Sequence, residues 1–465
     1  MADHGTDYLI VGAGAVGLAF ADTLLAESSD ATMTIVDRHG QPGGHWNDAY
    51  SFVALHQPSA FYGVNSLPLG SGAKDVHGVN AGLFELASGP EVSGYFDAVM
   101  RRRLLPSGRV RYLPMTDHLG DGRLRSILTG EEGSIEVARK LVDATYYGTS
   151  VPSTHRPKFA LEPGVRLVTP NALPHLARAA EAPPSRFVIL GAGKTAMDVG
   201  VWLLGSGVPA DQIAWVIPRD SWLLNRRNTQ PGMEFFHDAI GGQAAQMEAF
   251  AAAASADDLF ARLENAGIML RIHRDVQPTM FHYATISEAE VAALRTIGDV
   301  IRLGHVRRIA PDRITLDGGE VALADALYID CTASAVERRP PVPIFQPDRI
   351  VCQLVRAPQP AFSAALVAYV EARYEDDETR NALLATVPFP DRPEDYARTV
   401  LANLRNEAAW GKDPSLRSWI RSSRLDGFGK IVDAVASDDR DKMAVLGRIR
   451  DAALPAAANL RRLAV

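Results

Sequence analysis

Gly12, Gly14 and Gly17 have the spacing of a dinucleotide-binding turn, between a short apolar run and a helical pattern. In such a turn the first glycine allows a sharp bend, and the second lets the backbone approach a pyrophosphate. The third glycine lets helix and strand pack closely. Unpaired N–H groups at the start of the helix attract the anion. Asp37, 20 residues beyond Gly17, can accept hydrogen bonds from a ribose diol, which an empty glycine turn would not explain.

A second glycine-rich segment begins 179 residues after the first. Gly191 and Gly193 take the first two glycine positions, and Ala196 takes the third small position. Lys194 and Thr195 open the helix that follows. We expect Lys194 to add positive charge near a bound pyrophosphate, the alternative being that it points to water. The segment therefore predicts a second nucleotide site.

The end of the next strand, Ile217-Pro218-Arg219, predicts which coenzyme the second site takes. No acidic residue precedes Asp220 in this stretch. An acid would repel a 2′-phosphate, whereas Arg219 can pair with one. The pattern therefore favours NADPH, with NADH the less favoured coenzyme. A solvated surface arginine is the alternative.

Both glycine segments lie in a strand–helix–strand unit, which is the element that must position them. Each unit fits within about 30 residues, the length that a parallel crossover requires. Two such units predict an α/β fold with two Rossmann-like dinucleotide-binding domains, whose ligands lie at the carboxyl ends of parallel strands. The expected segments are 8–11, 16–27 and 32–36 in the first unit, and 187–190, 194–204 and 213–217 in the second.

Two passages that combine an apolar strand with Asp-x-Thr, 141–152 and 326–334, mark the crossings between the domains. Two crossings place the NADP domain as an insertion in a discontinuous FAD domain. The predicted parts are 1–165 for the first part of the FAD domain, 166–328 for the NAD(P) domain, and 329–465 for the rest of the FAD domain with C-terminal helices.

Helical additions are expected in two regions. Residues 222–300 are too long for a simple connection, so we expect a helical insertion there. Ser287, followed by Glu288 and Glu290, is typical of a helix start. The other helical patterns cover 235–267, 364–374, 394–410 and 414–423.

Composition excludes several classes of function. A formal charge of −7 over 465 residues argues against a nucleic-acid surface, because phosphate binding needs a basic patch. The two cysteines, Cys331 and Cys352, form neither a Cys-x-x-Cys relay nor a cluster with metal-ligand spacing, so no metal is expected. The apolar run 8–25 contains glycines and Asp22, and no later run is long enough for a membrane helix. We expect a soluble cytoplasmic protein with a small-molecule substrate, and homo-oligomerisation remains open.

Motifs beside the glycine segments resemble those of flavin-containing and Baeyer–Villiger monooxygenases. Gly-Gly-His-Trp at 43–46 follows Asp37 as Gly-Gly-x-Trp follows the ribose acid in that superfamily. The second segment, with Thr195 and Asp198, is similar to the superfamily's Gly-x-Gly-x-Ser-x-x-Asp. The resemblance spans roughly residues 5 to 375.

Two further stretches define how closely the chain follows this superfamily. The run 351–360 and the helix after it look like the closing strand and helix beside the flavin. The stretch 158–169 lacks the superfamily's Phe-x-Gly-x-x-x-His. We therefore identify the chain as a divergent member.

The resemblance implies FAD in the first domain, with its pyrophosphate at the first glycine segment and its adenine ribose at Asp37. Gln57 takes about the place of an amide side chain near the flavin, and His56 is a candidate proton carrier. The alternatives are that His56 satisfies a local backbone bond and that Trp46 is a packing residue. The further flavin-side residues implied are Arg38, Gly44, Trp46, Pro358 and Gln359.

The implied reaction is monooxygenation. NADPH reduces the flavin, the reduced flavin traps O₂ as a C4a-hydroperoxide, and one oxygen atom passes to a small organic substrate in a site that excludes water. The missing linker histidine keeps open an NAD(P)H-dependent flavin reductase or dehydrogenase without oxygen insertion. A non-catalytic nucleotide-binding protein is the third alternative. Arg226 and Arg227 belong either to a phosphate site or to a solvated loop.

Overall fold

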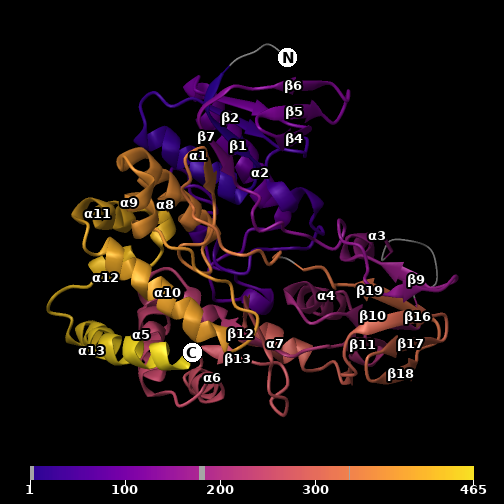
Figure 1. Ribbon diagram of the computed structural model, residues 1–465. Helices are drawn as coiled ribbons and strands as arrows, with labels where there is room; N and C mark the ends of the chain where they lie inside the picture. Colours follow the sequence, from indigo (N-terminus) through magenta and orange to yellow (C-terminus); the bar gives the residue numbers. More distant parts are fainter. Residues whose placement is uncertain (1–4, 177–183, 335, 465) are drawn as a thin grey trace.

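The computed structural model describes residues 5–176, 184–334 and 336–464, and its main elements are two parallel five-stranded sheets (Figure 1). The first sheet has the strand order β20-β7-β1-β2-β3 and the second β15-β11-β10-β19-β9. The strands of the first sheet are β1 (Thr6–Val11), β2 (Met33–Val36), β3 (Val110–Leu113), β7 (Val137–Asp143) and β20 (Arg349–Val351). Those of the second are β9 (Arg166–Val168), β10 (Arg186–Leu190), β11 (Ile213–Val216), β15 (Asp299–Ile301) and β19 (Ala326–Asp330).

The chain enters the second sheet and returns to the first. β20 of the first sheet follows β19 of the second, so the second body is inserted into a discontinuous first body. This confirms the predicted α/β fold with two Rossmann-like domains. The domain limits stay predictions, although β8 (Ala160–Leu161) already pairs with β16 (Val306–Ala310) of the second body, ahead of the expected limit at 165.

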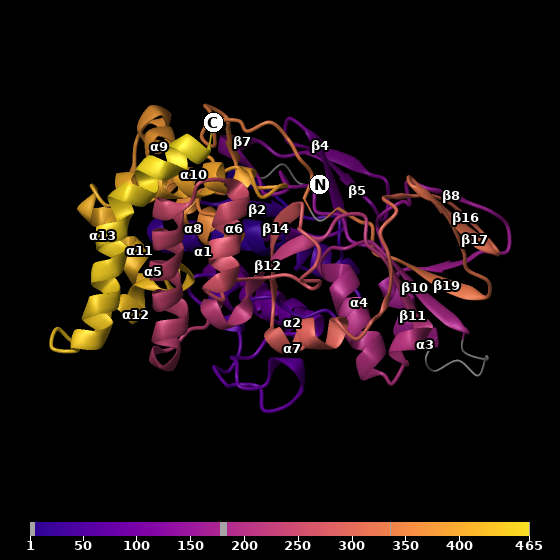
Figure 2. The same ribbon diagram turned by 90° about the horizontal axis from the view of Figure 1, so that it is seen from below.

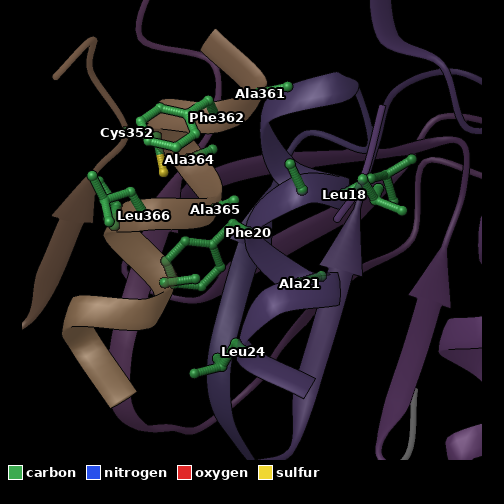
Figure 3. Close-up of a cluster of buried hydrophobic side chains, with 14 of the residues drawn as sticks. Leu18, Phe20, Ala21, Leu24, Cys352, Ala361, Phe362, Ala364, Ala365 and Leu366 are labelled. Atoms are coloured by element: carbon green, nitrogen blue, oxygen red, sulfur yellow. The ribbon is translucent and has the colours of Figure 1, made fainter. Parts of the chain in front are cut away.

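The helix after the first glycine segment packs against a helix from the far end of the chain. α1 (Ala15–Glu27) is buried along almost its whole length, and α8 (Pro360–Arg373) lies beside it. Figure 3 shows Phe20 of α1 projecting toward the alanine-rich face of α8, which includes Ala364 and Ala365. The small side chains let the two helices approach, so the first glycine segment is held by residues about 340 positions later.

A helical layer joins the insertion of the second body to the C-terminus (Figure 2). Its apolar core includes Phe250, Phe260, Phe281, Tyr396 and Leu460, all buried. The insertion also contains a three-stranded sheet of order β13-β12-β14, which the sequence did not predict. These elements are α5 (Phe236–Ala252), α6 (Ala256–Asn265), α10 (Asp395–Trp410), α13 (Arg440–Leu463), β12 (Ser221–Asn225), β13 (Met269–Leu270) and β14 (Met280–Ile286).

The remaining elements connect or flank these layers. The helices are α2 (Gly89–Val99), α3 (Leu173–Leu176), α4 (Lys194–Gly205), α7 (Glu288–Leu294), α9 (Asp377–Leu383), α11 (Pro414–Ser422) and α12 (Gly429–Asp433). The strands are β4 (Thr116–Gly120), β5 (Arg123–Ser126), β6 (Glu132–Ser134), β17 (Arg313–Leu316) and β18 (Gly319–Ala322). Within the described ranges, no helix combines the length and the apolar character that crossing a membrane requires.

Candidate cofactor sites

The first glycine segment forms the turn between β1 and α1, as predicted. Gly12 has a φ of 103°, a conformation that favours glycine. A Cβ on Gly17 would collide with the carbonyl oxygen of Gly12. A Cβ on Gly44 would lie 3.0 Å from Cα of Gly14, so the Gly-Gly-x-Trp segment passes directly over the turn. Gly14 caps α1 without a side-chain hydrogen bond, which leaves backbone N–H groups of the first turn for an anion.

A cavity of about 730 Å³ opens beside this turn. It brings together the turn itself, the predicted ribose acid Asp37 and loops from much later in the chain, so that the two parts of the first body close around one space. Of the predicted flavin-side residues, Gly12, Gly14, Asp37, Arg38, Gly44 and Pro358 line it. Other lining residues include His39, His45, Tyr62, His118, Thr145, Tyr147, Val336, Leu354 and Phe389.

Asp37 is held by its neighbours and keeps acceptor capacity toward the cavity. Its Oδ2 accepts the backbone N–H of Ala13 at 2.6 Å, and its Oδ1 lies 2.8 Å from Nδ1 of His39. The other ring nitrogen of His39 lies 2.8 Å from Oδ2 of Asp48. Burial lowers the pKa of His39, but hydrogen bonds to Asp48 and Asp37 outweigh it and raise that pKa overall. Since each carboxylate oxygen has two lone pairs, Oδ2 of Asp37 can still accept a ribose hydroxyl.

Several predicted flavin-side residues are not among those that line this cavity. Trp46 is a packing residue, because its Nε1 donates to the hydroxyl of Tyr62 at 2.8 Å and its ring contacts the core. Gln359 caps α8, and its Oε1 accepts Nε of Arg356 at 2.5 Å. Gln57 is half-buried and is not among the lining residues of this cavity. Their predicted contact with a flavin therefore stays a prediction.

His118 of β4 forms part of the cavity wall. Its Nε2 is buried and has no hydrogen-bond partner among the described residues. Burial is the main reason why its pKa is lowered, so the ring is neutral near pH 7. Because this nitrogen has almost no exposed surface, the ring contributes to the wall of the cavity. The glycine turn and Asp37 together fit a dinucleotide.

The second glycine segment has the same backbone form. Gly191 has a φ of 113°, and a Cβ there would lie 2.7 Å from the carbonyl oxygen of Cys331. Gly193 caps α4 without a side-chain hydrogen bond, and a Cβ at Gly193 would meet open space. Ala196 is fully buried, as its small-residue position requires. The backbone therefore fits a second anion site.

Lys194 does not serve this segment as predicted, because its ammonium group is part of a buried ion cluster. Nζ contacts Asp198 and lies 3.1 Å from Glu290, and the side chain is 9% exposed. Nη1 of Arg226 lies 2.7 Å from the other oxygen of Glu290. The prediction that Lys194 faces a pyrophosphate is therefore wrong: two carboxylates inside the protein take up its charge. Arg226 is 1% exposed and so belongs to neither of its two predicted settings.

A segment of the first body, residues 48–57, lies against the start of α4. The hydroxyl of Tyr50 donates to Oδ2 of Asp198 at 2.7 Å, and Phe52 stacks on Trp202 with ring centroids 4.9 Å apart. Burial lowers the pKa of His56 to about 4, with positive Lys194 adding to the effect. His56 is therefore neutral near pH 7, which removes the titration near 6.5 on which its role as a proton carrier depended. The carbonyl of His56 accepts Nε of Arg226 at 2.9 Å.

Arg219 lies where β11 ends, and it pairs with an acid from the C-terminal part of the chain. Its Nη2 lies 3.1 Å from Oδ1 of Asp391, which also accepts Arg338 at 2.7 Å and His282 at 2.8 Å. Arg227, by contrast, is an exposed arginine paired with Asp238 at 2.9 Å. Thr195 lies in the first turn of α4, close to Tyr50.

Sequence reasoning missed His39, His118 and Asp391. His39 could have been found, because it follows Asp37 by two positions and so leaves the same strand end. His118 and Asp391 have no local motif, and only the tertiary fold brings them to a strand end of a Rossmann sheet.

Comparisons with known proteins agree with this geometry. Residues 10–69 match the family model of an NAD(P)-binding Rossmann-like domain. Uncharacterized protein Rv2000 of Mycobacterium tuberculosis and uncharacterized protein Mb2023 of Mycobacterium bovis are each 48% identical to the chain over 436 residues. Each alignment covers 94% of this chain and 80% of the mycobacterial protein.

Solved structures similar to the chain include three monooxygenases. A flavin-containing monooxygenase from Stenotrophomonas maltophilia is 15% identical with a TM-score of 0.43, over 79% of this chain and 97% of that one. An open structure of cyclohexanone monooxygenase is 12% identical with a TM-score of 0.49, over 96% and 98%. Polycyclic ketone monooxygenase from Thermothelomyces thermophila is 12% identical with a TM-score of 0.48, over 99% and 89%. The assignment of the fold itself rests on the strand pairing described above.

Proposed function

Since the chain belongs to the same protein family as Rv2000 of Mycobacterium tuberculosis, we propose one function for both: an FAD-dependent oxidoreductase that draws its electrons from NAD(P)H. The finer proposal is that the enzyme is a monooxygenase acting on a small organic substrate and O₂. The observation that carries the proposal is the cavity beside Gly12 and Gly14, which reaches from the glycine turn to loops near Pro358 and Phe389.

Different groups around this cavity are placed to bind different parts of FAD. The first turn of α1 offers N–H groups to the pyrophosphate, and Asp37 accepts a hydroxyl of the adenine ribose. His39 holds Asp37 against the 44–48 turn through Asp48. When bound, FAD would supply the group that accepts the hydride. The protein would orient the reacting groups and exclude water from them.

The loop at 354–359 closes the cavity from the opposite side. Asn406 of α10 donates to the carbonyl of Val355 at 2.7 Å, and Asn403 both accepts from and donates to the backbone of Ala357. These amide side chains fix the loop that carries Pro358 against the cavity. A loop tied in this way can keep water from the reacting ring, which oxygen transfer needs.

The second candidate function is an NAD(P)H-dependent flavin reductase or dehydrogenase without oxygen insertion. The observation that favours it is the linker, since residues 158–169 lack Phe-x-Gly-x-x-x-His and contribute the short strands β8 and β9. Both candidates require FAD and hydride transfer. They differ in the fate of the electrons.

The test begins with the colour and flavin content of the purified protein. We expect a yellow protein that releases FAD on denaturation and whose flavin absorbance is lost anaerobically on adding NADH or NADPH. A colourless protein that takes up no FAD would rule the proposal out. Label from ¹⁸O₂ in an organic product marks a monooxygenase, and its absence during steady NAD(P)H oxidation marks a reductase.

Two glycine variants make this test specific to the turn. Gly17→Ala places a Cβ against the carbonyl oxygen of Gly12 and should abolish FAD retention. Gly94→Ala in α2 is the matched control, because a Cβ there meets open space. Equal FAD content in the two variants would show that the turn does not hold the cofactor.

A further inference from the structure

The two Rossmann units of this chain can be superposed residue by residue through their strand pairing. Val11 of β1 pairs with Val36 of β2, and Leu190 of β10 pairs with Val216 of β11. The glycine that follows each first strand donates to the last residue of each second strand, at 2.8 Å in the first unit and 3.0 Å in the second. Ile217 therefore occupies the position of Asp37, and Arg219 occupies that of His39.

Ile217 is buried and apolar, so the chain's own strand offers no carboxylate at the ribose position. A carboxylate reaches this strand end from elsewhere. Asp391, 172 residues beyond Arg219, lies 3.1 Å and 3.3 Å from its two terminal nitrogens. Arg338, on the crossing back to the first body, reaches the same carboxylate at 2.7 Å.

Hydrogen bonds of its backbone fix the position of Asp391. Its carbonyl accepts the N–H of Phe281 in β14 at 2.9 Å, and its own N–H donates to Asp395 at 3.0 Å. Its side chain is 19% exposed, whereas that of Arg338 is 59% exposed. The carboxylate is thus the fixed member of the group, and the arginines are arranged around it.

His282 adds a hydrogen bond but no charge. Burial lowers its pKa, and positive Arg219 and Arg338 act in the same direction, so the ring is neutral near pH 7. Its Nε2 lies 2.8 Å from Oδ1 of Asp391. Hydrogen bonds from Arg219, His282 and Arg338 outweigh burial and hold the pKa of Asp391 well below its usual range, so the acid is charged at any pH near neutrality.

Resting on the proposed function, we propose that Asp391 sets the coenzyme preference and that this chain takes NADH in preference to NADPH. The carboxylate of Asp391 occupies the donors of Arg219 and Arg338 that a 2′-phosphate would need. A phosphate entering this place would bring about two negative charges against a fixed carboxylate. The local sequence around Arg219 favoured NADPH because it contains no acid, and Asp391 supplies that acid through the fold.

The experiment compares the holoprotein with Asp391→Asn, which keeps the size of the side chain and a hydrogen-bonding oxygen. Anaerobic flavin reduction is followed with NADH and NADPH in turn. Because like charges held side by side repel, we expect NADH to be preferred by about tenfold or more in the native protein. Asp391→Asn should raise the efficiency of flavin reduction by NADPH relative to NADH by about tenfold or more. The change should come mainly from a lower NADPH concentration at half-maximal rate.

A binding measurement reads the same site without turnover. Calorimetric titration with adenosine 2′,5′-bisphosphate and with AMP reports the 2′-phosphate separately from the rest of the nucleotide. Asp391→Asn should bind the bisphosphate more tightly and leave AMP binding unchanged. Adding Arg338→Gln to Asp391→Asn should remove the gain.

Asp220→Asn is the matched control, because Asp220 follows Arg219 directly in the chain but pairs with Arg302 at 2.9 Å. Flavin content and thermal melting confirm that each variant is folded. Asp220→Asn should leave the coenzyme ratio unchanged.

The inference is wrong if the native protein prefers NADPH and Asp391→Asn does not alter the ratio of flavin reduction with the two coenzymes. That result would still be consistent with the proposed oxidoreductase function. If neither coenzyme reduces the flavin, and the protein binds neither adenosine 2′,5′-bisphosphate nor AMP, the inference and the proposed function are both wrong.

Discussion

At the scale of single residues, His39 makes the stability of the fold around the first cofactor site depend on pH. Its ring lies between Asp37 and Asp48, and its pKa is raised because these hydrogen bonds outweigh burial. A group whose pKa is higher in the folded than in the unfolded protein stabilises the fold fully below its unfolded value, about 6.5. That stabilisation is lost as the pH rises through the folded value.

His39→Gln should therefore lower the melting temperature more at pH 6 than at pH 9. Glutamine keeps a neutral hydrogen bond, so the difference between the two proteins should shrink as the pH rises above about 6.5. Melting curves of both proteins across this range measure it. A constant difference would mean that His39 acts through packing alone.

A second prediction at this scale concerns Lys194. A variant of this residue can show whether the lysine stabilises the fold or binds a coenzyme. Lys194→Met leaves Asp198 without its buried cation and should cost about 3–5 kcal/mol in the free energy of unfolding. Arg227→Met, which breaks an exposed pair with Asp238 and a contact with the ring of Phe235, should cost at most about 1 kcal/mol. Denaturant unfolding measures both.

The same two variants test coenzyme binding. If Lys194→Met were as stable as Arg227→Met but lost its affinity for NAD(P)H, Lys194 would be a pyrophosphate ligand after all.

At the scale of elements, two helices with the same N-terminal motif differ in what their caps do. Ser88 of α2 and Ser287 of α7 each form a capping box, with Glu91 and Glu290 respectively. The hydroxyl of Ser287 also donates to the carbonyl of Val79 at 2.6 Å, which ties the second body to the first. Ser287 therefore acts across the two bodies, whereas Ser88 acts within its own helix.

Ser88→Ala should cost about 1 kcal/mol, the usual value of a lost cap. Ser287→Ala should cost the same amount plus about 1–3 kcal/mol for the carbonyl that loses its donor. Chemical denaturation of the two variants gives the difference. Equal losses would show that the contact with Val79 adds nothing to stability.

Local sequence predicted the glycine turns because their conformation depends on a few adjacent residues. The φ of Gly12 and the close approach of Gly17 to its carbonyl are set within one turn. The direction of Lys194 depends on Glu290, 96 residues away, and the setting of Arg219 depends on Asp391, 172 residues away. Such charges meet only after two bodies and the C-terminal helices have packed, so no spacing rule predicts them.

The extra sheet β13-β12-β14 escaped prediction for a similar reason. β13 has only two residues, and β14 pairs with β12 although the two are separated by α5 and α6. The capping box at Ser287 and the helices of the insertion were predicted because their signals are local.

At the scale of the whole molecule, binding of the cofactor should stabilise the folded protein. A ligand that binds only the folded chain stabilises it by about 2.7 kcal/mol at a free concentration 100 times its Kd. We therefore expect protein stripped of flavin to melt at a lower temperature and to recover on adding FAD. Gly17→Ala should show no such recovery.

If FAD left the melting temperature of the stripped protein unchanged at saturating concentration, the cavity would not be its binding site. FMN is the control, since it lacks the adenosine half that Asp37 and the turn are placed to hold.

The wall of the large cavity is assembled from residues far apart in the sequence, from Val11 to Phe389. While the protein is being synthesised, its amino-terminal strand and glycine turn leave the ribosome long before the loop and the helix α8 that complete them. α1 therefore lacks its packing partner α8 until about 340 further residues have been translated. We therefore expect FAD to bind only after the loop at 354–359 has been translated, and we expect chaperones to keep α1 from aggregating until then.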